Sequence, residues 1–195
     1  MERTDEPRTR FRAALDALGA IALWSTLAFV SLVLKGVPPF FLVGVSLLGG
    51  AAVGARHVRL RGIRPAVLAL GVYGLFAYHL CLFIALRSAP PIEANLVNEL
   101  WPLLIVVLSP LVLPGTTLTA RHLGGAVLGF SGAALLVTGV SGGKVEFARD
   151  GALGYALALA AAIIWSTYSL LTKRVGAFPT SAVATFCFVA SSSWR

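Results

Sequence analysis

The chain has 195 residues, of which 57% are hydrophobic and only 12% are charged. This composition excludes an ordinary soluble domain and predicts an all-α, polytopic membrane protein in contact with the lipid bilayer. The formal net charge of +8 would indicate a nucleic-acid partner in a soluble protein, but here the basic residues lie between apolar runs. We therefore attribute the charge to membrane orientation and expect no nucleic acid.

The apolar runs predict six complete transmembrane helices and the start of a seventh, after a charged tail of residues 1–13. Most runs are close to the ~20 residues that a helix needs to cross a bilayer. The first run is interpreted as an uncleaved span, because no small-residue cleavage site follows it. The predicted spans are residues 14–34, 40–55, 65–86, 92–113, 121–140 and 151–172, with a seventh beginning near residue 179.

The distribution of lysine and arginine predicts the orientation of these spans. Basic residues are concentrated in the tail and in the segments that follow each even-numbered crossing, so the N-terminus is expected in the cytoplasm. The basic residues on the opposite side are Lys35, Arg87, Lys144 and Arg149.

Two spans carry glycines four residues apart, a spacing that lets helix backbones approach closely. They are Gly50 with Gly54 in the second span and Gly125 with Gly129 in the fifth. The two cysteines, Cys81 and Cys187, fall inside spans, where buried packing thiols are expected rather than a disulfide.

The fourth span combines polar residues with an apolar background. Asn95, Asn98, Glu99 and Pro102 are spaced i, i+3, i+4 and i+7, which places them on one face of a continuous helix. A carboxylate at membrane depth normally faces a partner or a watery cavity, and Pro102 leaves the Asn98 carbonyl without its helical donor. This face is interpreted as a binding surface, with a polar seam between two helices as the alternative.

Aromatic residues gather near the middle of the spans instead of at the membrane interfaces, where tryptophan is usual. A cavity lined by their rings would suit a flat, partly apolar solute, whereas the alternative is that they fill the core of the bundle. His79 either titrates against Glu99 or is a satisfied core histidine. The mid-span aromatic residues are Trp24, Tyr78, Trp101, Trp165 and Tyr168.

An internal repeat relates the first and sixth spans. Trp24-Ser-Thr recurs as Trp165-Ser-Thr, 141 residues later (165 − 24). Five spans in the first unit make the second unit inverted, an arrangement typical of secondary transporters. We expect residues 14–140 to form the first repeat, 141–150 a periplasmic loop and 151–195 the start of a second repeat. A second unit of equal length would extend far beyond residue 195, so we expect an N-terminal fragment.

These features resemble the EamA-type drug/metabolite transporter superfamily. The resemblance rests on the five-span repeat, the Trp-Ser-Thr of the first helix and the glycine-rich stretch 119–136. Asn98-Glu-Leu-Trp-Pro, preceded by Tyr78-His-Leu-Cys-Leu, resembles the aromatic amino-acid exporter branch, the YddG type. The resemblance implies a ten-helix inner-membrane carrier with a central cavity and both termini in the cytoplasm.

Position by position, the resemblance carries over to several residues of this chain. Asn98, Trp101 and Pro102 fall on the branch's fourth-span motif, Tyr78 falls on the polar aromatic of the third span, and Trp24 and Trp165 pair the first helices of the repeats. Glu99 and His79 depart from the pattern, because an uncharged or aromatic residue is expected at 99 and an acidic one can occur at 79.

The sequence therefore predicts an inverted-repeat helical bundle that exports amino acids, above all aromatic or neutral ones, across the bacterial inner membrane by alternating access. The alternatives are an exporter of another small metabolite or drug, or a non-transporting membrane protein. No enzymatic activity, cofactor or metal is expected, and the oligomeric state is left open. The predicted substrate-binding residues are Trp24, Tyr78, His79, Asn95, Asn98, Glu99, Trp101, Pro102, Trp165 and Tyr168.

Overall fold

The structure is a computed structural model, and it separates into two compact units, Met1–Gly36 and Val37–Arg195. In the first unit the described residues between 11 and 33 are helical. Trp24, predicted to bind substrate, lies outside the described residues. The residues that the structure describes are 11, 13–19, 21–22, 26, 29, 33–34, 36–58, 63–140, 142, 149–175 and 182–192.

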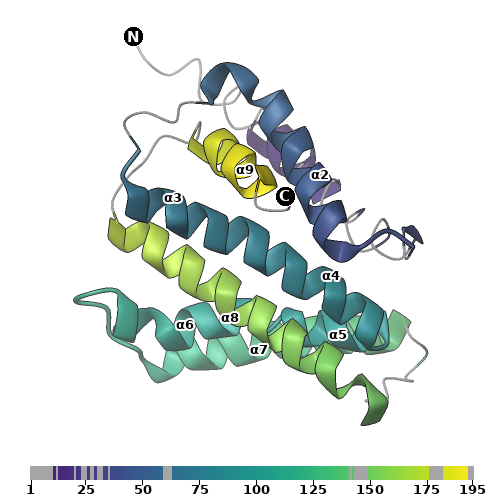
Figure 1. Cartoon of the computed structure of the whole chain (residues 1–195). Coiled ribbons are helices and arrows are strands. Elements are labelled where there is room, and N and C mark those ends of the chain that lie inside the picture. Colours follow the sequence, from purple (N-terminus) through teal and green to yellow (C-terminus); the bar gives the residue numbers. More distant parts are fainter. Residues whose placement is uncertain are drawn as a thin grey trace. The chain divides into compact units, whose positions relative to one another are not determined.

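The second unit contains only helical elements in its described part (Figure 1), so the all-α prediction is confirmed. Their ends agree with the predicted spans to within a few residues. The elements are α2 (Pro39–Val53), the 3-10 helix η1 (Ala55–His57), α3 (Pro65–Val72), the π-helix η2 (Tyr73–Ala77), α4 (Tyr78–Ser88), α5 (Pro91–Asn98), α6 (Trp101–Val112), α7 (Ala120–Val140), the 3-10 helix η3 (Arg149–Gly151), α8 (Ala152–Val175) and α9 (Ala182–Ser192).

Several of these elements join end to end into longer rods. Three rods in the described part are long and apolar enough to cross a membrane: Pro65–Ser88, Pro91–Val112 and Arg149–Val175. The first consists of α3, η2 and α4, and the last consists of η3 and α8. α2 and the helix Ala182–Ser191 are shorter apolar helices.

The rod Pro91–Val112 corrects the prediction of one continuous helix in the fourth span. α5 ends at Asn98, the Leu100 N–H donates to the Val97 carbonyl only three residues back, and helical bonding resumes when the Leu104 N–H donates to the Leu100 carbonyl. Pro102 is the physical reason, because it has no N–H and its ring would clash with the Asn98 carbonyl. The fourth span is therefore two helices joined by a turn at residues 99–100, with Asn95 and Asn98 before the turn, Glu99 within it and Pro102 after it.

α8 lies at the centre of this unit and packs against α4, α5 and α6 (Figure 1). Its first turn meets the end of α4, where Gly154 lies against Ala89. Its last turn meets the end of α6, where the Arg174 guanidinium donates to the Val112 carbonyl at 3.5 Å. α8 therefore runs antiparallel to the third span and parallel to the fourth.

Glycine positions explain how closely the helices approach. A Cβ at Gly54 would lie 2.5 Å from the Ala184 Cβ, and one at Gly50 would lie 3.5 Å from the Cys187 Sγ. The predicted small-residue face of the second span is therefore confirmed as the contact between α2 and α9. Two further sites were not predicted: Gly71 receives the ring of Phe186, and Gly74 receives the ring of Tyr168.

The corresponding prediction for the fifth span is wrong in the described part of the chain. Nothing lies within 4 Å of a Cβ placed at Gly125 or Gly129. α7 packs chiefly against α6 and, less extensively, against α5, and its outer side chains Leu128 and Leu135 are more than 70% exposed. Spacing alone shows that a helix could be approached closely, but it does not show whether a neighbour is there.

We predict that Gly71→Ala lowers the melting temperature of the detergent-solubilised protein. The added methyl group would overlap the ring of Phe186, which has no exposed surface, and overpacking of this kind typically costs about 1–3 kcal/mol. Gly49→Ala is the matched control, because nothing lies within 4 Å of its position and alanine favours a helix by about 1 kcal/mol. Equal melting temperatures for the two variants would contradict the contact.

Candidate functional site

Asn98, the last residue of α5, is a buried amide beside the break in the fourth span. It is 2% exposed, and its Nδ2 donates to the Tyr78 hydroxyl at 3.5 Å, which is a long hydrogen bond. Its Oδ1 is also buried and has no hydrogen-bond partner among the residues that the structure describes. Because an unpaired buried carbonyl oxygen is costly, this atom is suited to accept from a bound donor.

Aromatic rings from α4 and α8 lie next to this amide. The Tyr78 and Trp165 ring centroids are 4.8 Å apart with planes at 40°, and the Trp165 and Tyr168 centroids are 5.4 Å apart at 42°. Tyr78 is buried, whereas Trp165 and Tyr168 are half-buried. The structure therefore brings Tyr78, Asn98, Trp165 and Tyr168 together, from spans distant in sequence.

Trp101 begins α6 directly after the break, and Glu99 lies within it. Only Leu100 separates Glu99 from Trp101, so both side chains belong to the same turn of the chain. Both are half-buried, as is Asn95 in the preceding helix. Pro102 is exposed, and its visible contribution is the helix break rather than a contact with the other predicted site residues.

His79 has its hydrogen-bond requirement met within its own span. Its Nδ1 donates to the Leu75 carbonyl at 2.6 Å, and its ring makes edge contacts with Tyr78 and Phe83 at centroid distances of 5.0 and 6.1 Å. Of the two interpretations that the sequence left open, these contacts favour the core histidine over a pair with Glu99.

Two hydroxyl residues that follow Trp165 were not among the predicted site residues. The Ser166 Oγ donates to the Trp101 carbonyl at 2.9 Å, and the Thr167 Oγ1 lies 2.9 Å from the Tyr73 hydroxyl. The recurring Trp-Ser-Thr motif was the signal that could have identified them. Glu93, a buried carboxyl in the first turn of α5, had no comparable signal.

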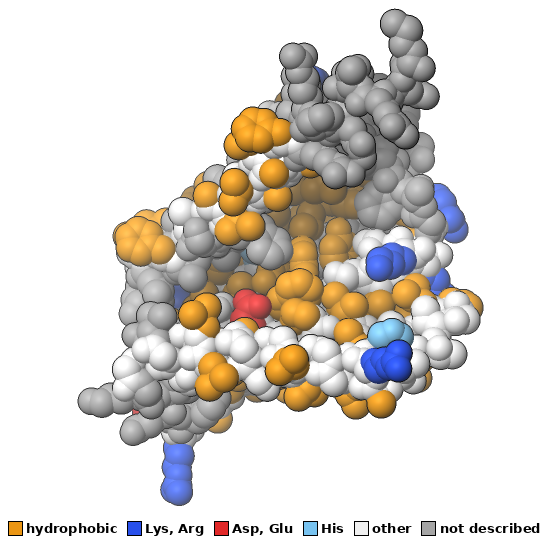
Figure 2. Space-filling model, turned by 180° about the vertical axis from the view of Figure 1, so that it is seen from behind, with side chains coloured by type: hydrophobic (Ala, Val, Ile, Leu, Met, Phe, Trp, Pro, Cys, Tyr) orange, Lys and Arg blue, Asp and Glu red, His pale blue; other side chains and the backbone are white. Residues whose placement is uncertain are grey.

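Polar groups in this region are amides, hydroxyls, a carboxylate and backbone carbonyls. No group of three or more His, Cys, Asp or Glu residues that could hold a metal lies within the described ranges. Figure 2 shows one face of the molecule, on which hydrophobic side chains are numerous and an acidic side chain is in view. A region of aromatic rings, amides and hydroxyls can hold a small, mostly apolar solute by stacking and by a few hydrogen bonds.

Comparison with known proteins places this arrangement in context. The family model described as the EamA-like transporter family matches residues 12–138. The chain is 41% identical over 191 residues to the aromatic amino acid exporter YddG of Ancylobacter novellus, an alignment that covers 94% of this chain and 66% of that protein. It is 29% identical over 185 residues to the Escherichia coli protein of the same name, covering 85% of this chain and 60% of that one.

A crystal structure of a similar protein has also been solved. It has 42% sequence identity to this chain and a TM-score of 0.74, over 94% of this chain and 65% of that one. The chain thus spans less than two thirds of the length of the relatives that it matches.

We predict that Asn98→Ala leaves the thermal stability of the ligand-free protein nearly unchanged. Its amide makes one long hydrogen bond and leaves its oxygen unpaired, so its net contribution to the free energy of unfolding should be below about 1 kcal/mol. The measurement is the melting temperature in detergent. A loss above about 3 kcal/mol, as for a fully bonded buried group, would make Asn98 a structural residue.

Proposed function

This chain belongs to the EamA-like transporter family, and we propose that the protein exports aromatic and other neutral amino acids by alternating access. Members of this family are multi-pass membrane transporters. An exporter of another small metabolite or drug is the second candidate, and the 29% identical Escherichia coli exporter supports the amino-acid class over it.

The observation that carries the proposal is the unpaired Asn98 oxygen beside the rings of Tyr78, Trp165 and Tyr168, which form an aromatic cluster. An amino acid has an ammonium group that can donate to the Asn98 Oδ1. The face of an aromatic ring such as Trp165 attracts the same cation. An aromatic side chain on the solute would stack against the remaining rings at centroid distances like those within the cluster, 4.8–5.4 Å. The two ends of the solute would thus be recognised by different groups.

Substrate-binding roles follow from this placement. Tyr78, Asn98, Trp101, Trp165 and Tyr168 are proposed to contact the solute directly. Asn95 and Glu99 are proposed to line the part of the site that receives the polar end of the solute. For an enzyme, a nucleophile paired with a base would be required, whereas the groups that meet here are suited to binding.

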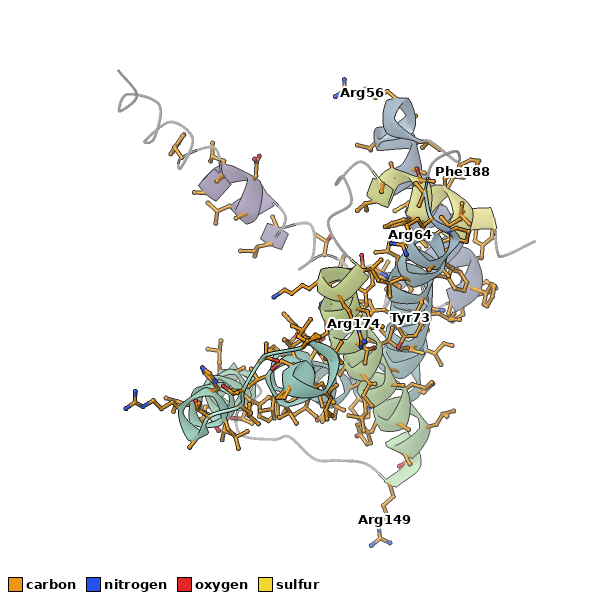
Figure 3. The ribbon with its side chains drawn as sticks, turned by 90° about the vertical axis from the view of Figure 1, so that its left-hand side faces the viewer. Arg56, Arg64, Tyr73, Arg149, Arg174 and Phe188 are labelled. Carbon is orange, nitrogen blue, oxygen red and sulfur yellow. The ribbon has the colours of Figure 1, made fainter. Side chains whose placement is uncertain are left out.

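The membrane topology proposed for this chain is a five-span unit at residues 14–140, a periplasmic loop at 141–150 and an inverted unit from 151. The antiparallel packing of α8 against the third span supports an odd number of crossings in the first unit. In Figure 3, Arg56 and Arg64 lie towards one end of the second unit and Arg149 lies at the other. Because basic residues favour the cytoplasm, the N-terminus is proposed to lie there, in the inner membrane.

A cysteine-labelling experiment tests this topology. In a background lacking Cys81 and Cys187, cysteines placed singly at Arg56 and Arg149 should react with a membrane-impermeant maleimide from opposite sides of the membrane. Position 149 should label in intact cells, and position 56 should label only after the inner membrane is opened. Labelling of both positions from the same side would contradict the five-span unit.

A binding experiment tests the site. Trp101→Ala should weaken the affinity of the purified protein for L-tryptophan by about 1–3 kcal/mol, the range for a buried aromatic contact, and Trp101→Phe should recover part of that loss. Phe188→Ala is the control, because this aromatic residue of α9 is 42% exposed and lies outside the cluster.

The same assay separates the two candidate functions. Other neutral amino acids should compete with L-tryptophan, whereas nucleosides and sugars should not. If Trp101→Ala and Asn98→Ala both bind with unchanged affinity, the solute site lies elsewhere. If the wild-type protein binds and exports only nucleosides or sugars, the amino-acid assignment is wrong.

A further inference from the structure

The two hydroxyl residues that follow Trp165 contact both places where the neighbouring spans depart from α-helical geometry. One place is the turn between α5 and α6, and the other is the π-helix η2. We propose that Ser166 and Thr167 are positioning residues. They set the orientation of the aromatic rings that are proposed to contact the solute, which are those of Tyr78, Trp101, Trp165 and Tyr168. This inference rests on the proposed function only for the identity of the solute.

Ser166 holds the first residue after the break. Its side chain has no exposed surface, and its Oγ lies 2.9 Å from the Trp101 carbonyl and 2.6 Å from the Ala162 carbonyl of its own helix. The single hydroxyl hydrogen is shared between these two acceptors. Because Pro102 removes a regular helical bond at this point, the bond from Ser166 is an external restraint on the first turn of α6 and hence on the Trp101 side chain.

Thr167 contacts the other irregular segment through a side chain and not through its backbone. Its Oγ1 donates to the Ile163 carbonyl at 2.7 Å, so the Tyr73 hydroxyl is the donor in the 2.9 Å bond between the two side chains. Tyr73 is the first residue of η2, and single π-helical turns are frequent at functional sites. The next residue, Gly74, lies against the Tyr168 ring. The first two residues of η2 therefore both contact α8.

Three consecutive residues of α8 thus reach three different neighbours. Successive side chains on a helix point about 100° apart, so Trp165 meets Tyr78 in α4, Ser166 meets Trp101, and Thr167 meets Tyr73. A simple polar seam would join regular helices along one face. Here one hydroxyl ends at the Trp101 backbone carbonyl after the break, and the other ends at the Tyr73 side chain in η2. Removing either one would move the neighbouring aromatic rings without touching the solute.

The test uses protein labelled with 5-fluorotryptophan, whose four tryptophan ¹⁹F resonances are assigned with single Trp→Phe variants. Ser166→Ala should shift or broaden the Trp101 resonance and weaken the affinity for L-tryptophan about two- to tenfold, the value of one hydrogen bond. Ser166→Thr, which keeps a hydroxyl, should restore both. Ser169→Ala is the matched control, because its Oγ donates to the Trp165 carbonyl within its own helix.

Double variants separate a positioning role from a general loss of stability. In the Trp101→Ala background, Ser166→Ala should cause no further loss of affinity, because both changes act through the same ring. Thr167→Val and Tyr73→Phe remove the same bond, so their effects on affinity should be equal and should not add. These two residues are only partly buried or exposed, which keeps the test available if Ser166→Ala does not fold.

The outcomes distinguish this inference from the proposed function. If the wild-type protein does not bind L-tryptophan but the Trp101 resonance moves in Ser166→Ala, the function fails and the positioning role stands. If wild-type binding is normal, an unmoved Trp101 resonance together with additive losses in the double variants overturns the positioning role.

Discussion

A proline in the middle of a membrane span creates a local deficit of backbone hydrogen bonds, and this deficit restricts what can surround the span at that depth. In hydrocarbon there is no water to compensate, so irregular backbone is tolerated only where protein groups or a polar cavity surround it. Pro102 divides the fourth span into α5 and α6. The centre of α8 lies beside this division, and the Ser166 hydroxyl reaches the first carbonyl beyond it. The neighbourhood of the break is consequently the place where polar groups can persist at depth.

The fold was largely predictable from hydropathy, and its irregular points were not. Long apolar runs predicted the rods Pro65–Ser88 and Arg149–Val175 closely, because length and polarity are local properties of the chain. Pro102 was recognised as removing a donor, yet a continuous helix was still expected, since periodicity assumes unbroken geometry. The π-helix at Tyr73 has no local signal in its composition. It occurs where Gly74 receives a ring from α8, which is a tertiary effect.

The residues of the candidate site likewise include some that could be predicted from the sequence and some that could not. Tyr78, Asn98 and Trp165 were predicted because a polar or aromatic residue at membrane depth is unusual in its own span. Ser166 and Thr167 are ordinary helix residues on that criterion, and only their partners in other spans give them a role. The glycine pairs show the same contrast. Positions 50 and 54 lie against side chains of α9, whereas a Cβ placed at Gly125 or Gly129, which have the same spacing, would meet no described residue within 4 Å.

The insertion of Phe186 at Gly71 and of Tyr168 at Gly74 has a consequence for biosynthesis. Both rings belong to segments made about 100 residues after the glycines that receive them, and a ribosome adds ~5–20 residues per second. For several seconds, therefore, the third span is present without these two rings, and Gly71 and Gly74 face lipid or an insertion factor. Local helix formation is far faster than this delay, so the third span forms early and the rings dock late. The final geometry of the aromatic cluster, which includes Tyr168, is thus acquired only after α8 has left the ribosome.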